Sequence, residues 1–304
     1  MHYHGAALLF LSCSCLTAAA QQARTSPTAP STPGKLLLSG FNSNGVYVYR
    51  TADGTPRGVV PDVRGAQSIV LGADGLLYVC AEKVDQVVRI DPETRVVLDV
   101  FVSDDPLTLE DENGPLDGPT AACFGPEGDL FVSSFENDQV LRFDGLSGAY
   151  EGVFVASASG GLDGPDAGTK WGPDGLLYVP SFWNDRVLRY NADGSFQGAF
   201  IPNRRGGLRQ PRDLVWHDGL WYVASSFNNR VLRYDSAGNF VDRFCDVNRP
   251  YCVAFHPLDG NLYVASLGNN GVRVFDGANG DPLGPRVTSG AGGIDGAVYL
   301  YFLQ

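Results

Sequence analysis

Short apolar segments separated by turn residues recur along most of this chain. In residues 124–155 the apolar stretches LFV and VLRF alternate with the polar stretches SSFEND and DGLSG. Similar segments begin at residues 71, 171, 216 and 255. Together with the copy at 124 they make four steps from 71 to 255, with a mean length of 46 residues. The apolar stretches are rich in β-branched and aromatic residues, which is typical of β-strands. Recurrence at this period indicates a repeat architecture.

Each copy predicts four antiparallel strands joined by turns. An Asp-Gly pair favours a tight hairpin because such turns require positive φ. The copies hold this pair at residues 74–75, 174–175, 218–219 and 259–260. One isolated sheet of this size would bury little surface and have open edges. Radial packing of several copies removes both problems, which predicts a β-propeller.

The number of blades and the way in which the ring closes follow from the period. Residues 35–304 hold about six periods. The first copy, from Leu36, lacks an innermost strand, whereas residues 296–302 (GAVYLYF) predict a lone strand at the end. We therefore expect an all-β fold, a six-bladed β-propeller of four-stranded antiparallel blades, closed by the C-terminal strand completing the first blade.

The repeat resembles that of the NHL-repeat β-propellers, in which a Pro-led inner strand is followed by Tyr-Val-Ala and an Asn-x-Arg segment. Residues 211–215 (PRDLV), 222–225 (YVAS) and 228–231 (NNRV) follow this pattern. The resemblance covers nearly everything after residue 35 and implies the six-bladed fold. It does not name a function, because this fold carries many.

One departure from the NHL pattern is systematic. Where that family often has Asp after Tyr-Val-x, this chain has a small hydroxyl residue, at Ser134, Ser181, Ser225 and Ser266. We expect these serines to make structural hydrogen bonds, so that they offer no row of carboxylates.

The first 34 residues predict a signal and a linker. The apolar run 6–16 is too short to span a bilayer, and the small residues 18–20 suit cleavage, so residues 1–20 are interpreted as a signal peptide. A lipoprotein signal ending at Cys13 fits less well. Residues 21–34 are a Pro/Ser/Thr-rich linker, and 35–304 the propeller. We expect a secreted, extracellular protein, periplasmic in a bacterium, with no membrane span.

Four cysteines remain after the signal. Cys245 and Cys252 flank a short connection, and Cys80 and Cys123 lie on strands of adjacent blades. In a secreted chain these positions favour two disulfides, Cys245–Cys252 and Cys80–Cys123. Buried free thiols at Cys80 and Cys123 are the alternative.

Composition limits the possible functions. The formal net charge is −12, which disfavours nucleic acid as a partner because phosphate backbones would be repelled. His217 and His256 are the histidines outside the signal, so a three-histidine zinc site is not expected. Neither a G-x-S-x-G nor a phosphate-loop motif is present. We expect a monomer.

One face of the propeller should collect the long connections between blades, together with the loops between second and third strands. Variable loops on a rigid scaffold are where function tends to lie. Aromatic groups beside amide and carboxylate groups can bind sugars or peptides. The candidate ligand-binding residues are Phe135, Glu136, Trp183, Asn184, Phe227, Asn228 and Arg209.

Packing between blades and local charge bear on which of these residues would bind a ligand. Phe135 and Phe182 recur at one repeat position, so packing between blades is favoured for them, whereas Trp183 and Phe227 should be exposed. A basic stretch on this acidic chain suits a carboxylate or a sulfate; it holds Arg204, Arg205, Arg209 and Arg212.

Acidic residues in the glycine-rich connections suggest calcium, which prefers oxygen ligands in loops. The candidate ligands are Asp117, Asp163, Asp166 and Asp295. A solvated acidic rim that keeps the protein soluble is favoured over calcium binding. No other cofactor is expected.

Two functions remain. The first is a secreted, non-enzymatic scaffold that binds a protein, peptide or glycan through its long-loop face. The second is a divalent-metal hydrolase or lactonase of the regucalcin/gluconolactonase type, a family with a similar six-bladed ring and a metal in the channel. Its candidate ligands here would be Glu82, Asn113, Asp117, Asp163 and Asp295. The second ranks lower because that family's early Glu-Gly-Pro element is not found near Leu36.

Overall fold

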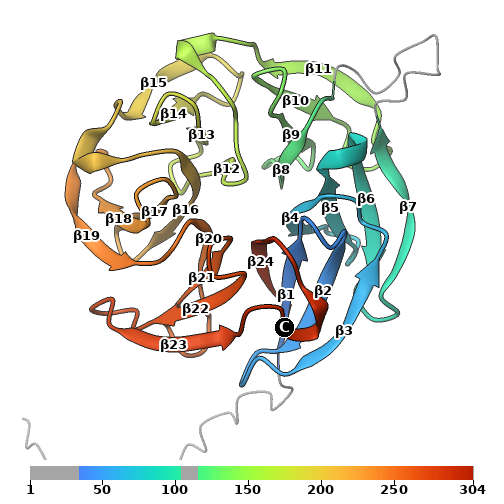
Figure 1. Ribbon diagram of the computed structural model, residues 1–304. Helices are drawn as coiled ribbons and strands as arrows, with labels where there is room; N and C mark the ends of the chain where they lie inside the picture. The colour runs from blue at the N-terminus through green and yellow to red at the C-terminus, as the bar shows by residue number, and fades with distance from the viewer. Residues whose placement is uncertain (1–33, 104–115, 304) are drawn as a thin grey trace, which may run out of the picture. The chain divides into compact units, whose positions relative to one another are not determined.

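Six four-stranded antiparallel sheets stand as blades around a central axis (Figure 1). The computed structural model describes residues 34–103 and 116–303. The predicted signal, most of the predicted linker and Asn113 lie outside this part of the chain. Within these residues four single-turn 3-10 helices occur in the loops between strands: η1 (Glu82–Val84), η2 (Ser159–Gly161), η3 (Arg205–Gly207) and η4 (Ala291–Gly293). None of the helices in the described part is long and apolar enough to cross a bilayer.

Blades 1 to 3 each have one strand at the channel and three strands further out. From the innermost strand outward, blade 1 consists of β24 (Ala297–Leu303), β1 (Lys35–Gly40), β2 (Gly45–Arg50) and β3 (Pro56–Pro61). Blade 2 consists of β4 (Ala66–Leu71), β5 (Leu77–Ala81), β6 (Gln86–Asp91) and β7 (Val96–Ser103). Blade 3 consists of β8 (Pro119–Phe124), β9 (Leu130–Ser134), β10 (Gln139–Phe143) and β11 (Tyr150–Val155).

Blades 4 to 6 repeat this order. Blade 4 consists of β12 (Lys170–Trp171), β13 (Leu177–Ser181), β14 (Arg186–Tyr190) and β15 (Phe196–Ile201). Blade 5 consists of β16 (Pro211–His217), β17 (Leu220–Ser225), β18 (Arg230–Tyr234) and β19 (Phe240–Asp246). Blade 6 consists of β20 (Pro250–Phe255), β21 (Leu262–Ser266), β22 (Gly271–Phe275) and β23 (Pro282–Val287).

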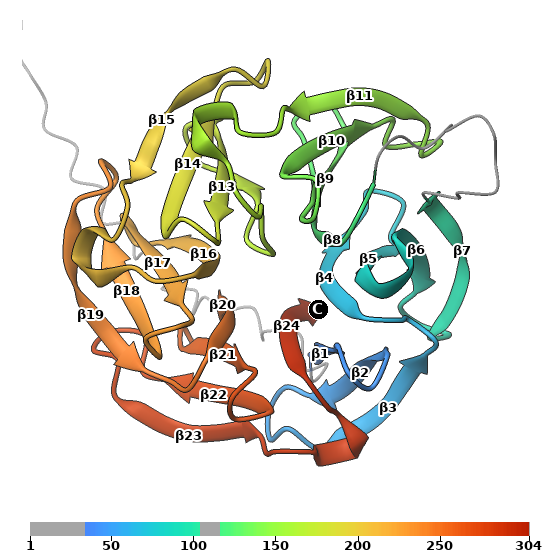
Figure 2. The same ribbon diagram turned by 45° about the horizontal axis from the view of Figure 1, so that its top comes forward.

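The two ends of the propeller share blade 1. Strand β24 runs antiparallel to β1, with Leu38 opposite Leu300 and Lys35 opposite Leu303. In Figure 2 the red last strand lies beside the blue first strand at the inner edge of this blade. The predicted six-bladed fold and its closure by the C-terminal strand are therefore confirmed.

The core lies between blades rather than inside any one of them. Six clusters of buried apolar side chains fill the six gaps between neighbours, and each draws on two adjacent blades. In the gap between blades 1 and 6, for example, Leu36 and Leu38 pack with Tyr263 and Val274. A strand is therefore apolar on both faces, since each face of a blade covers a neighbour.

The Asp-Gly turns lie on the face opposite the blade connections. The glycine of each predicted pair has positive φ, for example 81° at Gly75 and 75° at Gly175. In the first of these turns the Asp74 carboxylate accepts hydrogen bonds from the Leu76 N–H (3.0 Å) and the Tyr78 hydroxyl (2.9 Å). The turn is thereby tied to a tyrosine that packs between blades 2 and 3.

The cysteines correct one prediction. Cys80, Cys123, Cys245 and Cys252 are all free thiols, so neither predicted disulfide is present. Cys80 packs in the gap between blades 2 and 3, whereas Cys123 packs in the gap between blades 3 and 4. Cys245 and Cys252 are separated in the same way, by blade 6. Nearness in the ring did not bring the sulfur atoms together because the second cysteine of each pair faces the next gap.

Closure of the ring can be tested at Leu300, which is 2% exposed in the β24–β1 pair. Leu300→Ala is expected to destabilise the protein by about 2–5 kcal/mol, because it leaves a cavity where the two ends of the chain meet. Leu283→Ala on the outer strand β23, where the leucine is 56% exposed, is the control and should change stability by less than about 0.5 kcal/mol. Urea unfolding measures both; equal losses would contradict this account of closure.

Candidate functional site

Six side-chain-to-backbone hydrogen bonds join the blades on the face that carries the long connections. The loop between the second and third strand of each blade ends on an Asp or Asn with positive φ, a conformation that these residues tolerate. Each side-chain oxygen accepts a hydrogen bond from a backbone N–H just before or at the start of the next inner strand, at 2.7–3.2 Å. We call these residues the Asx bridges: Asn44, Asp85, Asp138, Asp185, Asn229 and Asn270.

The serines at the ends of the second strands hold the same connections. Ser134 Oγ accepts a hydrogen bond from the Asp117 N–H (2.8 Å), and Ser181 Oγ does so from the Asp163 N–H (2.9 Å). Ser225 Oγ binds the Arg209 N–H in the same way (2.9 Å). The structural hydrogen bonds predicted for these serines are confirmed. The start of the inner strand in blades 3, 4 and 5 is thus tied to its own blade by the serine and to the preceding blade by the Asx bridge.

One residue at the start of each inner strand reaches the mouth of the central channel. The preceding residue is Pro or Ala; in blades 2 to 6 it pairs with the last residue of the second strand, as Pro119 does with Ser134. In blades 2, 3, 5 and 6 the register then shifts, and such bulges re-aim a side chain. We call the six residues the channel-mouth ring: Gln67, Thr120, Asp166, Arg212, Tyr251 and Val298.

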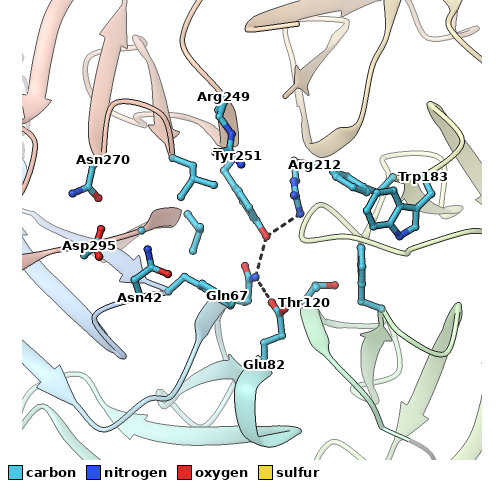
Figure 3. Close-up of a pocket in the computed structure, with 16 residues that line it drawn as sticks. Asn42, Gln67, Glu82, Thr120, Trp183, Arg212, Arg249, Tyr251, Asn270 and Asp295 are labelled. Carbon is cyan, nitrogen blue, oxygen red and sulfur yellow. Dashed lines mark hydrogen bonds between the residues drawn. The ribbon is translucent and has the colours of Figure 1, made fainter. Parts of the chain in front are cut away.

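A chain of polar contacts crosses this ring (Figure 3). The Gln67 amide N–H₂ donates to the Glu82 carboxylate and to the Tyr251 hydroxyl (2.9 Å). Arg212 Nη1 donates to the same hydroxyl (3.2 Å) and to the Asp166 carboxylate (2.7 Å). These five residues come from blades 2, 5 and 6 and from the segment leading into blade 4, so the chain depends on the ring being closed.

Burial changes the protonation of this chain. Burial raises the pKa of Glu82 to about 7; the Gln67 hydrogen bond opposes the shift and the Asp166 carboxylate adds to it. Burial also raises the pKa of Asp166, against the effect of the Arg212 guanidinium. A carboxyl group that changes charge near neutral pH in a pocket is typical of a functional site.

Four residues of the polar chain, Gln67, Glu82, Arg212 and Tyr251, form the floor of a pocket of about 540 Å³. Asp166 lies outside the lining and holds Arg212. One wall is aromatic: Phe182 and Trp183 have ring centroids 4.7 Å apart, and Phe135 lies 6.1 Å from Trp183. On the other side of the floor lie Asn42, Asn270 and Asp295 (Figure 3). The pocket therefore has an apolar side and a polar side.

Several polar groups of the pocket have no protein partner. Gln67 is 3% exposed, and its Oε1 accepts no hydrogen bond; Arg212 Nε is also buried without one. Arg249 and Asp295, which line the pocket, form no ion pair with another described residue. Buried polar atoms are nearly always hydrogen-bonded, so an unpaired acceptor here points to a ligand or a water molecule.

The structure divides the predicted ligand-binding residues. Phe135 and Trp183 line the pocket, and Trp183 is 58% exposed, as expected. Asn184 and Asn228 instead donate from Nδ2 to the carbonyls of Gly161 and Gly207, both at 2.5 Å, and so support the connections.

The other predicted ligand-binding residues lie outside the pocket lining. Phe227 is 62% exposed, with the Arg209 guanidinium 5.0 Å from the centre of its ring. The Glu136 backbone N–H donates to the Asp117 carbonyl at 3.3 Å. Phe182, for which packing was expected, does line the pocket; it is 4% exposed and carries the Arg212 guanidinium 4.0 Å from its ring centre.

The four predicted calcium ligands are not brought together. Asp295 lines the pocket, and Asp166 is bound to Arg212. Asp117 and Asp163 lie next to different Asx bridges; burial raises the pKa of each, and the neighbouring Asp85 or Asp138 adds to the effect. Calcium binding by this set stays a prediction that the geometry does not favour.

A different acidic group is the one compact enough to share an ion among residues 34–103 and 116–303: Asp129, Asp144 and Glu151. Arg142 already pairs with Asp129 and Glu151, at 2.5 and 2.7 Å.

The arginines of the predicted basic stretch do not act together, because they have different partners. Arg204 and Arg209 pair with Asp185, while Arg212 alone enters the pocket.

Sequence reasoning did not identify Gln67, Thr120 or Tyr251 as site residues. A pattern in the sequence nevertheless pointed to these positions. The repeats place Pro or Ala at one position and then differ completely at the next, which is occupied by Gln, Thr, Asp, Arg, Tyr or Val. A variable residue inside a repeated register indicates a position freed from packing, which a comparison of the aligned copies would have shown.

Comparison with known proteins supports the fold and no closer relationship. No protein-family model matches the chain, and no curated protein sequence matches it. A protein of unknown function from Bacteroides caccae is similar with a TM-score of 0.69 and 12% identity, over 90% of this chain and 100% of that one.

Two further solved structures show how widely this architecture is used. A chain of a nidogen/laminin complex has a TM-score of 0.69 and 13% identity, over 89% of this chain and 98% of that one. Virginiamycin B lyase from Staphylococcus aureus has a TM-score of 0.59 and 15% identity, over 90% of this chain and 89% of that one. Identities this low show the shared six-bladed propeller fold alone.

The Asx bridges can be tested at Asp138, whose Oδ1 accepts the Gly164 N–H at 2.7 Å. Asp138→Ala is expected to cost about 1–3 kcal/mol, because it leaves that N–H unpaired. Asp138→Asn keeps an acceptor and tolerates positive φ, so it should cost less than about 0.5 kcal/mol. Urea midpoints compare the two variants, and equal losses would argue against the hydrogen bond.

The raised pKa of Glu82 predicts a pH-dependent stability. The protonated form of Glu82 contributes to the free energy of unfolding. This contribution is fully present below about pH 4.5 and is lost as the pH rises through about 7. Glu82→Gln should remove up to about 3 kcal/mol of this fall, since one pKa unit corresponds to about 1.4 kcal/mol. Unfolding free energies from pH 4 to 8 measure it, with the exposed Glu93→Gln as control. Parallel curves for wild type and Glu82→Gln would refute it.

Proposed function

We propose that this protein is a secreted binding propeller that holds its ligand in the pocket at the mouth of the channel. The observation that carries the proposal is the pocket itself, with an aromatic side, a polar side and the unpaired buried acceptor of Gln67 on its floor. Concave sites of this size, largely apolar and with a few converging polar groups, are the usual places for ligands.

The size of the pocket favours a small ligand or the end of a chain. About 540 Å³ holds a few amino-acid or sugar residues, so a peptide or a glycan would enter by one end. Loops around the mouth would then contact what remains outside. The nidogen structure similar in fold comes from a complex with laminin, so this architecture is compatible with binding a macromolecule.

A metal-dependent hydrolase or lactonase is the second candidate. The raised pKa of Glu82 in the pocket favours it, and virginiamycin B lyase shows that an enzyme can have this fold. Of the other proposed ligands, Asp295 lines the pocket whereas Asp117 and Asp163 do not. The Arg212 guanidinium stands in the same floor and would repel a cation, so binding ranks first. Lactone hydrolysis, assayed with and without chelator in wild type and Glu82→Gln, distinguishes the two.

The binding proposal predicts an asymmetry between two exposed aromatic residues on one face. A screen of peptide and glycan arrays with the wild-type protein supplies the ligand. Trp183→Ala should then weaken binding at least about tenfold, because aromatic residues at such sites commonly contribute more than 1.4 kcal/mol. Phe227→Ala is the matched control, since Phe227 is similarly exposed but lies outside the pocket. Calorimetry measures both; equal effects would place the ligand elsewhere on this face.

A further inference from the structure

The pocket contains two arginines whose hydrogen-bonding capacity is not fully used, although the chain as a whole is acidic. Arg212 belongs to the floor and Arg249 to the lining of the pocket, and the formal net charge of the chain is −12. The lining also holds the acidic residues Glu82 and Asp295, but neither forms an ion pair with Arg212 or Arg249, so the two arginines keep donors for an anionic group on the ligand. If the proposed binding function holds, on which this inference rests, the two arginines therefore constrain the chemistry of the ligand.

Arg212 is held in one orientation. Its guanidinium lies between the rings of Phe182 and Tyr251, 4.0 and 4.5 Å from their centres. Its Nη1 is bound to Asp166 and Tyr251, while its Nε has no partner. An arginine fixed in this way is suited to bind a carboxylate because its planar donors need no further ordering.

Arg249 supplies a second positive group near the same opening. Its backbone N–H is bound by the Asx bridge Asn229 (2.8 Å), which fixes where its side chain starts. The residue is exposed, and its guanidinium pairs with no carboxylate of the described chain. Both arginines line the same pocket, and Figure 3 shows Arg212 next to the Tyr251 hydroxyl. A ligand carboxylate in this pocket would be attracted by both positive charges.

The remaining free groups define what accompanies the carboxylate. Gln67 Oε1 is a buried acceptor and requires an N–H or O–H donor. The wall formed by Phe135, Phe182 and Trp183 requires an apolar side chain or a flat ring. The last residue of a peptide presents an N–H, a carboxylate and a side chain around a single Cα atom, so it can meet all three requirements.

We infer that the pocket binds the free C-terminal end of a peptide whose last residue is apolar or aromatic. A sugar acid also carries a carboxylate, and the polar side of the pocket offers partners for its hydroxyl groups; the peptide end is preferred because its apolar side chain fills the wall formed by Phe135, Phe182 and Trp183. Capture of a terminal carboxylate by fixed donors is a known mode of peptide recognition.

Matched peptides test this inference on the full-length protein. N-acetyl dipeptides ending in Leu, Phe or Trp are prepared as free acids and as C-terminal amides, and binding is measured by calorimetry. The acids are expected to bind at least about tenfold more tightly, because a charge-assisted hydrogen bond contributes about 1.5–3 kcal/mol. Glucuronic-acid-ended oligosaccharides and their neutral counterparts are measured alongside.

Three variants separate the contributions. Arg249→Gln, at an exposed position, should remove most of the preference for acid over amide. Asp295 lies in the same pocket as Arg249 and carries the opposite charge. Asp295→Asn should strengthen binding of the acids, because it removes a negative charge that repels the ligand carboxylate. Trp183→Ala should weaken acid and amide forms alike, since it acts on the side chain.

Each other outcome contradicts the inference. Equal binding of acid and amide, with both lost in Trp183→Ala, overturns the carboxylate assignment and leaves the proposed binding function standing. Binding of uronate oligosaccharides but of no peptide acid overturns the peptide assignment. No binding by any of these probes overturns the inference, while the array screen decides the proposed function independently.

Discussion

The hydrogen-bonded pairing of β24 with β1 is the constraint on which the other features of this molecule depend. It joins the two ends of the propeller in one blade and leaves no blade without a neighbour on either side. Because the core lies between blades, an open ring would expose two apolar faces at once. Closure also brings six inner strands around one axis, so residues far apart in the sequence, such as Gln67 and Tyr251, can share a hydrogen bond.

Repetition of the scaffold allows variation at the site. The Asx bridges and the serines of the second strands hold the connections with nearly the same hydrogen bonds in successive blades. Since these contacts fix the backbone, the side chain at the channel-mouth position is free to differ between blades. The result is a rigid frame with an asymmetric floor, in which Glu82, Gln67, Tyr251, Arg212 and Asp166 form one chain. Such preorganisation lowers the cost of binding a ligand.

Much of the fold could be predicted from sequence because its determinants are local and are repeated. The Asp-Gly turns, the strand pattern and the unmatched strand at residues 296–302 together indicate six blades and the closure. The site was predicted less well. Trp183 and Phe135 were found because aromatic loop tips are conspicuous, but Asn184 and Asn228 turned out to support loops. The disulfides were predicted from nearness in the ring, which does not say into which gap Cys80 or Cys123 points.

What the sequence determined by itself is the repeating unit, the number of copies and the face on which the long connections gather. These follow from periodic burial and turn chemistry, which act within about 50 residues of chain. Only the tertiary structure decided that Gln67, Glu82, Tyr251, Arg212 and Asp166 meet, that Arg212 lies between two rings, and that the four cysteines stay apart. The physical reason is that these contacts form across the channel or between blades, where the closing of the ring, rather than spacing along the chain, sets the distances.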